Sequence, residues 1–488
     1  MVPKSYSDFA HQFYLRIGHN WISANKSYSQ SYSQSYSQSY SQSYSQSYSE
    51  RAVESVDRLL GVLRRRGLLR GEEIQKELGI SQPVMSRLVR AAGSRVCRFG
   101  RSVATRYALP REVAGLGRQA PVFRVDELGY PNRHGTLHFL ADSGCWLERE
   151  SGDSQSFPGL PPFMEDMRPQ GYIGRGFPSR YPGLRLPVSI RDWSEEDHLI
   201  ALATRGEDCV GNLIIGAESL DRFLAVPPQP RTREDYPSLA TGALAGQPGS
   251  SAGGEHPKFA VYAEDRHLLV KFASGDGAAA DRWRDLLVCE YLALEVLREA
   301  GVPAPRSEWF DRDGSRYLEM DRFDRVGRLG RRGVISLCAI DCHYLGDSFT
   351  NWSRAGQRIL DEPSLSLSTE HADRLVWLDT FGDLIGNTDR HLGNFSFFAE
   401  EAKELALTPT PVYDMLPMVF APVGANLIER QFAPHPPTAL NLRMWHEVAN
   451  HARRYWSRLC EESRLSAGFR RIAADCRDTL ARLIDERS

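Results

Sequence analysis

The sequence predicts an α+β protein of several domains, in which a short basic helical region precedes a β-rich region and a longer region of strands followed by helices. The chain has 488 residues, which at about 100 to 200 residues per domain implies two to four domains. Apolar residues recur at helical spacing from residue 53 onward, whereas short β-like runs between Pro- and Gly-rich loops fill residues 118–235. Beyond residue 330 the pattern is mostly helical.

The composition excludes several classes of protein. Lys plus Arg number 60 and Asp plus Glu 62, with 41% hydrophobic residues, so the chain is not collagen-like, fully disordered or supercharged. No run approaches the roughly 18 apolar residues of a membrane helix, and the first residues lack the apolar centre of a signal peptide. The eight cysteines form no C-x-x-C pair, which fits a reducing compartment. We therefore expect a cytoplasmic protein with no membrane partner.

Residues 1–50 include a low-complexity repeat. Residues 27–50 read SYSQ five times and then SYSE, with no aliphatic residue, Gly or Pro. Such a segment cannot bury enough apolar surface to offset the entropy of ordering, so we predict disorder over residues 1–50. A passive spacer is the favoured interpretation of the repeat.

Residues 51–112 predict a small basic domain of three helices and a hairpin. The first helix carries apolar residues from Val53 to Leu63 and stops at Gly67, and the second lies near residues 72–78. Ser81 is a good N-cap for the third. The stretch RVCRFGRSVATRYAL reads as two strands around Gly100, and the domain holds 14 basic and 6 acidic residues, a local charge of +8.

This order of elements resembles a winged helix-turn-helix, whose third helix enters the major groove of double-stranded DNA. The candidate DNA-contacting residues are Gln82, Ser86 and Arg87 on the third helix and Arg95, Arg98 and Arg101 on the wing. A domain that reads a palindrome would favour a homodimer. The alternative is a helical domain for protein contact, with its arginines merely solvated.

Residues 118–235 are predicted as a second, mixed domain, with helical pattern only toward residues 195–203 and near Leu220. A Gly/Ser/Pro-rich stretch at residues 240–257 then introduces two strands, KFAVYAED and RHLLVKFA. A helix over residues 283–300 ends at Gly301. After the hairpin-like WFDRDGSRYLEMDRF the chain is mostly helical, so the remaining boundaries are set at 236–330 and 331–488.

The most informative motif is GNTDRHLGNFSFF at residues 386–398. Asp389 and Asn394 have the D-x-x-x-x-N spacing of a kinase catalytic loop, in which the Asp accepts the proton of the substrate hydroxyl and the Asn holds Mg²⁺. Asp414, in VYDMLP, follows where a second metal-binding carboxylate is required. Because Mg²⁺ takes few protein carboxylates and relies on phosphate oxygens, two protein oxygens and a nucleotide suffice.

Upstream residues complete a phosphoryl-transfer pattern. Lys271 ends an apolar strand and Glu290 lies in the following helix, an arrangement that aims an ammonium at the α- and β-phosphates and fixes it with an ion pair. The Gly/Ser loop at residues 249–254 is positioned to cover the phosphates with backbone N–H groups. Each signal alone is common by coincidence, whereas their order along the chain favours phosphoryl transfer.

These motifs resemble the HipA family of serine/threonine kinases, the toxin component of bacterial toxin–antitoxin modules. The matching segments are SSAGGE at 250–255, HLLVKF at 267–272, CEYLALEVLREAGVPAP at 289–305, EMDRFDR at 319–325, GNTDRHLGNFSFF and VYDMLP. Residues 118–235, with RPQGYIGR at 168–175, look like the family's N-terminal subdomain. A helix-turn-helix fused at the front looks like the YjjJ branch of the family.

The resemblance implies a two-lobed protein-kinase-like fold that uses ATP and Mg²⁺. Asp389 would be the catalytic base, Asn394 and Asp414 the Mg²⁺ ligands, and Asp321 and Phe323 the hinge that holds the adenine. The implied cofactor-binding residues are Lys271, Glu290, Asp321, Phe323, His391, Tyr413, Ser251, Ala252, Gly253 and Gly254. A structural histidine in the catalytic loop is the alternative for His391.

The resemblance also implies autophosphorylation of a loop serine, which ejects the loop and switches the enzyme off. Ser250 aligns with that serine, and Ser251 is the adjacent candidate. The family commonly has Gln-Glu-Lys after the loop glycine, whereas this chain has Glu-His-Pro before Lys258. The family's phosphate-contacting lysine after the loop therefore cannot be assigned to Lys258 from the resemblance.

The leading hypothesis is an ATP- and Mg²⁺-dependent serine/threonine protein kinase that also binds DNA. The resemblance suggests an aminoacyl-tRNA synthetase as the acceptor and an antitoxin as a partner. One alternative is a DNA-binding regulator whose kinase-like domain only senses nucleotide. Another is a phosphotransferase for a small molecule or a lipid, although no basic amphipathic membrane-surface helix is evident.

Overall fold

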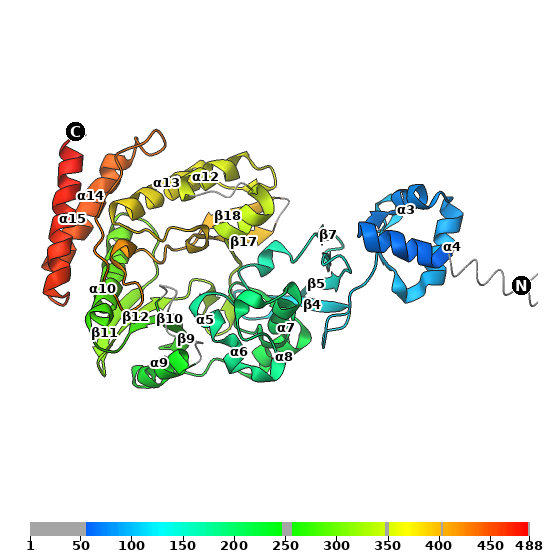
Figure 1. The fold of residues 1–488 in the computed structure, drawn as a ribbon, viewed down its shortest axis with the longest axis horizontal. Coiled ribbons are helices and arrows are strands. Elements are labelled where there is room, and N and C mark those ends of the chain that lie inside the picture. The colour runs from blue at the N-terminus through cyan, green and yellow to red at the C-terminus, as the bar shows by residue number, and fades with distance from the viewer. Residues whose placement is uncertain (1–54, 246–255, 347–350, 402–403, 487–488) are drawn as a thin grey trace, which may run out of the picture. The chain divides into compact units, whose positions relative to one another are not determined.

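The computed structural model describes residues 55–245, 256–346, 351–401 and 404–486 (Figure 1). The predicted disorder of residues 1–50 and the Gly/Ser loop at residues 249–254 lie outside these ranges. The chain divides into two compact units, Met1–Leu109 and Pro110–Ser488. Each unit is described by itself.

The described part of the first unit, from residue 55 onward, contains three α-helices and a three-stranded antiparallel sheet. A helix over residues 55–66 precedes β1 (Leu69–Arg70), α3 (Gly71–Leu78) and α4 (Gln82–Ala92), and β2 (Cys97–Phe99) and β3 (Arg106–Ala108) follow, with strand order β1-β3-β2. Gly79 ends α3 at φ 66°, a left-handed conformation that favours glycine. Ser81 does stand at the N-cap of α4, but its side chain makes no capping hydrogen bond. Leu59, Ile74 and Met85 lie in the core between these elements.

The second unit begins with a five-stranded antiparallel sheet of order β7-β6-β5-β4-β8. Its strands are β4 (Gln119–Val125), β5 (Pro131–Phe139), β6 (Cys145–Arg149), β7 (Ser154–Phe157) and β8 (Leu213–Ile215). The predicted helices are confirmed as α7 (Glu195–Arg205) and α8 (Ala217–Ala225), while the short helices α5 (Gly171–Arg175) and α6 (Phe177–Arg180) were not expected. Leu199 and Leu202 of α7 pack in one core with Leu137 and Leu147 of the sheet.

A four-stranded sheet with a helix on each face follows. The strands β9 (Lys258–Ala263), β10 (Arg266–Ala273), β11 (Ser307–Arg312) and β12 (Ser315–Asp321) have the order β11-β12-β10-β9. Because side chains alternate along a strand, Val270 and Phe272 pack in a core with α9 (Tyr236–Ala245). Leu318 and Ala273, on the other face, pack with α10 (Ala278–Glu299). Lys271, opposite Leu318 in the ladder, lies on the α10 face.

One helix boundary in this region differs from the sequence prediction. Within the Gly/Ser/Pro-rich stretch 240–257, residues 240–245 form the end of α9, where Ala240 packs into the core. The helix α10 begins at Ala278 rather than at Trp283, because three alanines extend it toward Gly277. Both strands around residues 258–273 and the following hairpin are confirmed.

The C-terminal region is mostly helical, as expected, but it also contains a four-stranded sheet that the sequence did not reveal. Its strands β15 (Val334–Ser336), β16 (Leu365–Ser366), β17 (Ser396–Glu401) and β18 (Leu405–Pro409) have the order β15-β17-β18-β16. The main helices are α11 (Leu337–Ile340), α12 (Trp352–Asp361), α13 (Thr369–Leu384), α14 (Trp445–Glu461) and α15 (Ala467–Asp485), and Figure 1 shows the last two side by side. In the parts of the chain that the structure describes, no helix is long and apolar enough to cross a membrane.

Candidate phosphoryl-transfer site

A buried ammonium bridges two carboxylates at the centre of the site. Lys271 Nζ donates hydrogen bonds to Glu290 Oε1 at 2.6 Å and Oε2 at 2.7 Å, and it also donates to Asp414 Oδ1. Lys271 is 2% exposed and Glu290 0% exposed. Strand β10, helix α10 and the segment after β18 therefore meet at one charged cluster, which brings together three of the sequence-predicted residues.

The charges of this cluster depend on each other. Burial alone would lower the pKa of Lys271, but the carboxylates of Asp414 and Glu290 raise it above its usual value. Burial alone would raise the pKa of Asp414, yet the Lys271 ammonium holds it well below its usual range. For Glu290 burial dominates and raises the pKa against the attraction of Lys271. Asp414 is therefore ionised at neutral pH, the state in which a carboxylate binds a cation.

The loop between α13 and β17 lies against this cluster through Asn387. The Asn387 side chain accepts from the backbone N–H of Asp389 at 3.0 Å and donates to the backbone oxygen of Asp414, also at 3.0 Å. Asn394 donates to the backbone oxygen of Asp389 at 2.8 Å. The Asp389 side chain is 52% exposed, which leaves its carboxylate accessible to another molecule. Sequence reasoning missed Asn387, although it directly precedes the T-D pair of the motif.

Arg390 holds the same loop against the helices. Its Nε donates to Asp379 Oδ1 of α13 at 3.0 Å, and its Nη1 donates to the backbone oxygen of Asn387. The other oxygen of Asp379 accepts from Ser353 Oγ of α12 at 2.7 Å. Because these partners come from three separate segments, the loop has few alternative positions. Arg390 and Asp379 were not predicted as site residues.

Tyr413 and Phe323, two of the residues expected around the nucleotide, lie close to this loop. The Tyr413 hydroxyl donates to the backbone oxygen of Gly393 at 3.0 Å, and burial raises its pKa. The rings of Tyr413 and Phe323 are 5.7 Å apart between centroids. The His391 Nδ1 accepts from the backbone N–H of Gly393 at 3.1 Å, and its Nε2 lies 4.0 Å from Asp389 Oδ1. The Asp321 carboxylate accepts from Arg266 at 2.6 Å.

The backbone at Asp414 is strained. Its φ is 54°, a left-handed value that costs a non-glycine residue on the order of 1–3 kcal/mol. The hydrogen bond from Asn387 to the Asp414 carbonyl helps to hold this conformation. Strain of this kind persists where the surrounding structure fixes it, and it clusters at functional sites.

The available ligands fit a cation that is shared with phosphate oxygens. Asn394 and Asp414 supply an amide oxygen and a carboxylate, both hard oxygen donors of the kind Mg²⁺ accepts. The Tyr413–Gly393 hydrogen bond joins the two segments that carry them. Among the described residues, no group of three or more His, Cys, Asp or Glu side chains could hold a metal by itself. Mg²⁺ would then need oxygens from a bound phosphate.

Lys258 also lies on the side of the sheet that faces the cluster. It stands directly opposite Lys271 in the β9–β10 ladder, and side chains at such opposed positions share a face. His256 before it is buried, with its ring centroid 4.2 Å from that of Trp283. Burial, aided by Lys271 and Lys258, lowers the pKa of His256 to about 3. The loop residues Ser250, Ser251, Ala252, Gly253 and Gly254 lie outside the described ranges.

The candidate DNA-contacting residues belong to the first unit. The inward side of α4 carries Met85 and Ala92. The exposed side carries Gln82, which accepts a hydrogen bond from Gln75 at 2.7 Å. The remaining candidates are also exposed: Ser86, Arg87, Arg95, Arg98 and Arg101.

Two protein-family models match the chain: the YjjJ-like toxin middle domain over residues 116–224 and the HipA-like C-terminal domain over residues 250–484. A relative, Toxin YjjJ of Escherichia coli (strain K12), is 36% identical over 431 residues, which cover 85% of this chain and 95% of the relative.

The chain is also similar to solved structures. The complex of HipA, HipB and operator DNA from Shewanella oneidensis MR-1 matches with a TM-score of 0.47 and 16% identity, over 75% of this chain and 97% of the matched chain. The Helicobacter pylori proinflammatory kinase CtkA matches with a TM-score of 0.34 and 13% identity, over 49% and 91%. On the family matches and the relative's identity, the chain belongs to the YjjJ-like toxins of the HipA type.

Proposed function

We propose that the chain is an ATP- and Mg²⁺-dependent serine/threonine protein kinase. The observation that supports this most strongly is the buried Lys271 ammonium held by Glu290 and Asp414, beside a loop that carries Asp389 and Asn394. In protein kinases an equivalent Lys–Glu pair and a metal-binding Asp must both be in place for transfer. Membership of the HipA-type toxins adds independent support.

Each residue has a distinct role in this proposal. Lys271 binds phosphate oxygens and is oriented by Glu290. Asn394 and Asp414 hold Mg²⁺, which when bound neutralises the charge of the transferring phosphate. Asp389 accepts the proton of the acceptor hydroxyl, and its exposure lets a protein side chain approach. Catalysis is then mainly positioning and charge stabilisation.

The test is intact-mass measurement of the purified chain after incubation with ATP and Mg²⁺. The proposal expects a gain of one phosphate, which maps to Ser250 or Ser251 and disappears in Asp389→Asn. An aminoacyl-tRNA synthetase is the proposed external acceptor and is added as a second substrate. If neither protein gains phosphate, the kinase proposal fails and a nucleotide-sensing regulator takes its place.

We also propose that the first unit binds double-stranded DNA as a winged helix-turn-helix. Its α3, the turn at Gly79 and α4 precede a hairpin, and the exposed side of α4 and the segments around the hairpin carry Arg87, Arg95, Arg98 and Arg101. The local charge of +8 over residues 51–112 favours contact with phosphate. An operator palindrome would engage a homodimer, and an antitoxin is the further proposed partner.

DNA binding is tested by comparing the chain's own promoter with random DNA over a range of salt concentrations. We expect Arg87→Ala to weaken promoter binding by about 1–3 kcal/mol. Arg66→Ala is the matched control, because Arg66 is paired with Glu77 at 2.9 Å. If both DNAs bind with the same affinity and the same salt dependence, binding is non-specific attraction between arginines and phosphates, and the operator hypothesis is wrong.

A further inference from the structure

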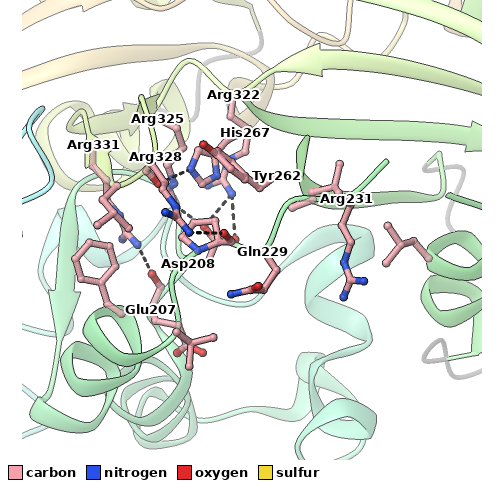
Figure 2. A pocket seen from close by; sticks show the side chains of 17 residues that line it. Glu207, Asp208, Gln229, Arg231, Tyr262, His267, Arg322, Arg325, Arg328 and Arg331 are labelled. Atoms are coloured by element: carbon pink, nitrogen blue, oxygen red, sulfur yellow. Dashed lines mark hydrogen bonds and ion pairs between the residues drawn. The ribbon is translucent and has the colours of Figure 1, made fainter. Parts of the chain in front are cut away.

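A cavity whose wall includes several charged side chains lies apart from the residues of the phosphoryl-transfer site. It has a volume of about 270 Å³, and its walls come from the middle domain, from β9 and β10, and from the segment after β12. Figure 2 shows Arg322, Arg325, Arg328 and Arg331 gathered on one side of it, with Arg231 apart from them. None of the residues assigned above to the nucleotide, the metal or catalysis lines this cavity.

Two of these arginines are already neutralised. Arg322 donates to Asp208 at 3.0 Å and to Asp324 Oδ2 at 3.0 Å. Arg325 donates to Asp208 at 2.8 Å and to Asp324 at 2.7 Å. These two guanidinium groups and two carboxylates form a closed network that joins the middle domain to the segment after β12. Because the charges of these four side chains cancel, the network alone gives no reason to expect a bound ligand.

The remaining charges do not cancel. Arg231, Arg328 and Arg331 line the cavity, and Glu207 is the acidic residue left beside them. Arg331 is 4% exposed, and its guanidinium carbon lies 4.7 Å from the ring centroid of Phe223. Its Nη2 donates to the backbone oxygen of Glu207, whereas its Nη1 is buried and has no hydrogen-bond partner among the described residues. Burial, aided by repulsion from Arg325, lowers the pKa of Arg331 to about 9.

A buried guanidinium nitrogen without a partner is costly, because desolvation is not offset by a hydrogen bond. Glu207 Oε2 is likewise buried without a partner in the described chain. Both residues line the cavity, so its wall contains an unpartnered cationic donor and an unpartnered acceptor beside apolar side chains such as Phe223 and Val261. A molecule that carries both a phosphate and a hydroxyl group would satisfy both, since arginine matches the geometry of phosphate oxygens.

We propose that this cavity is a binding site for a small phosphate-bearing molecule, with the phosphate on Arg331 and Arg328 and a hydroxyl group on Glu207. Arg328 is exposed, and its Nη2 contacts the Pro228 backbone oxygen at 3.5 Å, a long hydrogen bond that a charged phosphate oxygen can replace. The binding does not rest on the proposed kinase activity. Arg322 lines the cavity and lies between Asp321 and Phe323 in the chain. A molecule bound in the cavity would therefore lie close to the expected adenine hinge.

The test is isothermal titration calorimetry of the whole chain with inorganic pyrophosphate and, separately, with AMP, both without metal. We expect binding that Arg328→Gln and Arg331→Gln each weaken about tenfold or more. Arg332→Gln is the matched control, because the Arg332 side chain pairs with Glu127 at 3.1 Å and does not line the cavity. Tighter binding of AMP, which carries ribose hydroxyls, than of pyrophosphate would support the hydroxyl contact to Glu207, whereas equal or weaker binding of AMP would overturn that contact.

Lys271→Met separates this cavity from the kinase site. We expect pyrophosphate binding to persist in this variant. Loss of binding in Lys271→Met with retention in Arg328→Gln would place the anion at the kinase site and overturn the proposal, as would the absence of measurable binding to the unaltered chain. If Arg331→Gln fails to fold, Arg328→Gln still decides the question, because Arg328 is exposed and surface substitutions change stability little.

Discussion

Replacing Glu290 by Gln tests whether the buried ion cluster organises the site. The amide keeps the shape of the side chain but removes the charge that faces Lys271 at 2.6 and 2.7 Å. Removing one partner of a buried pair typically costs about 3–5 kcal/mol because a charge is left uncompensated. Here Asp414 still contacts the ammonium, so we expect the smaller loss of a charge-assisted hydrogen bond, about 1.5–3 kcal/mol.

The assay is native-state hydrogen exchange of peptides from β10 and α10, since a chain of several domains has no single free energy of unfolding. Glu299→Gln is the matched control on the same helix, because its side chain is 37% exposed and pairs with Arg458. We expect a loss of about 0–1 kcal/mol for this control. The reasoning is refuted if the two variants change the exchange of β10 equally. In the proposed kinase, Glu290→Gln also lowers kcat, whereas Glu299→Gln does not.

The remaining predictions concern the loop and the response to pH. Asn387→Ala leaves the Asp414 carbonyl and the Asp389 N–H without their side-chain partner. We expect a loss of about 1–3 kcal/mol of stability per unsatisfied group, measured as faster hydrogen exchange of the loop. A Thr388→Ala variant with the same effect would contradict this prediction. The pKa of His256 falls from 6.5 to about 3 on folding, so its contribution to stability is present above pH 6.5 and is lost as the pH falls toward 3, by up to about 1.4 kcal/mol per pH unit. Acid unfolding of His256→Phe checks this, and an unchanged slope between pH 6 and 4, roughly the middle of that window, would count against it. Arg390→Lys loses the contacts that the planar guanidinium makes to Asp379 and to the Asn387 carbonyl. We expect a lower kcat for phosphate transfer with little change in thermal stability. An unchanged kcat would show that the position of the loop does not depend on this arginine.

The Lys271–Glu290–Asp414 cluster can be predicted from the sequence because its residues occur in the order along the chain that a kinase site requires. Lys271 and Glu290 are 19 residues apart and form the expected ion pair, since a strand followed by a packed helix brings their side chains together. Asp389 and Asn394 lie in one loop, joined by the hydrogen bond from Asn394. These predictions need only local structure and one strand–helix contact.

Other features depend on partners that no spacing reveals. Asp208 binds Arg322 from 114 residues away, so the arginines of EMDRFDR could be read from the sequence but their counter-ions could not. The same holds for Arg390, whose partner Asp379 is itself fixed by Ser353 from another helix. The sheet of the C-terminal region escaped prediction because β15 and β16 are only three and two residues long. Such strands are defined by their neighbours rather than by their own pattern.

The most direct test of the central claim compares nucleotide binding with phosphate transfer in the unaltered chain and in Asp389→Asn. ATP affinity is measured by calorimetry, and transfer is measured as labelled phosphate incorporated into the chain or an added acceptor. The account predicts that Asp389→Asn binds ATP with nearly unchanged affinity and transfers no phosphate. Undiminished incorporation by Asp389→Asn would contradict it, because the proposed base would then not take part in transfer.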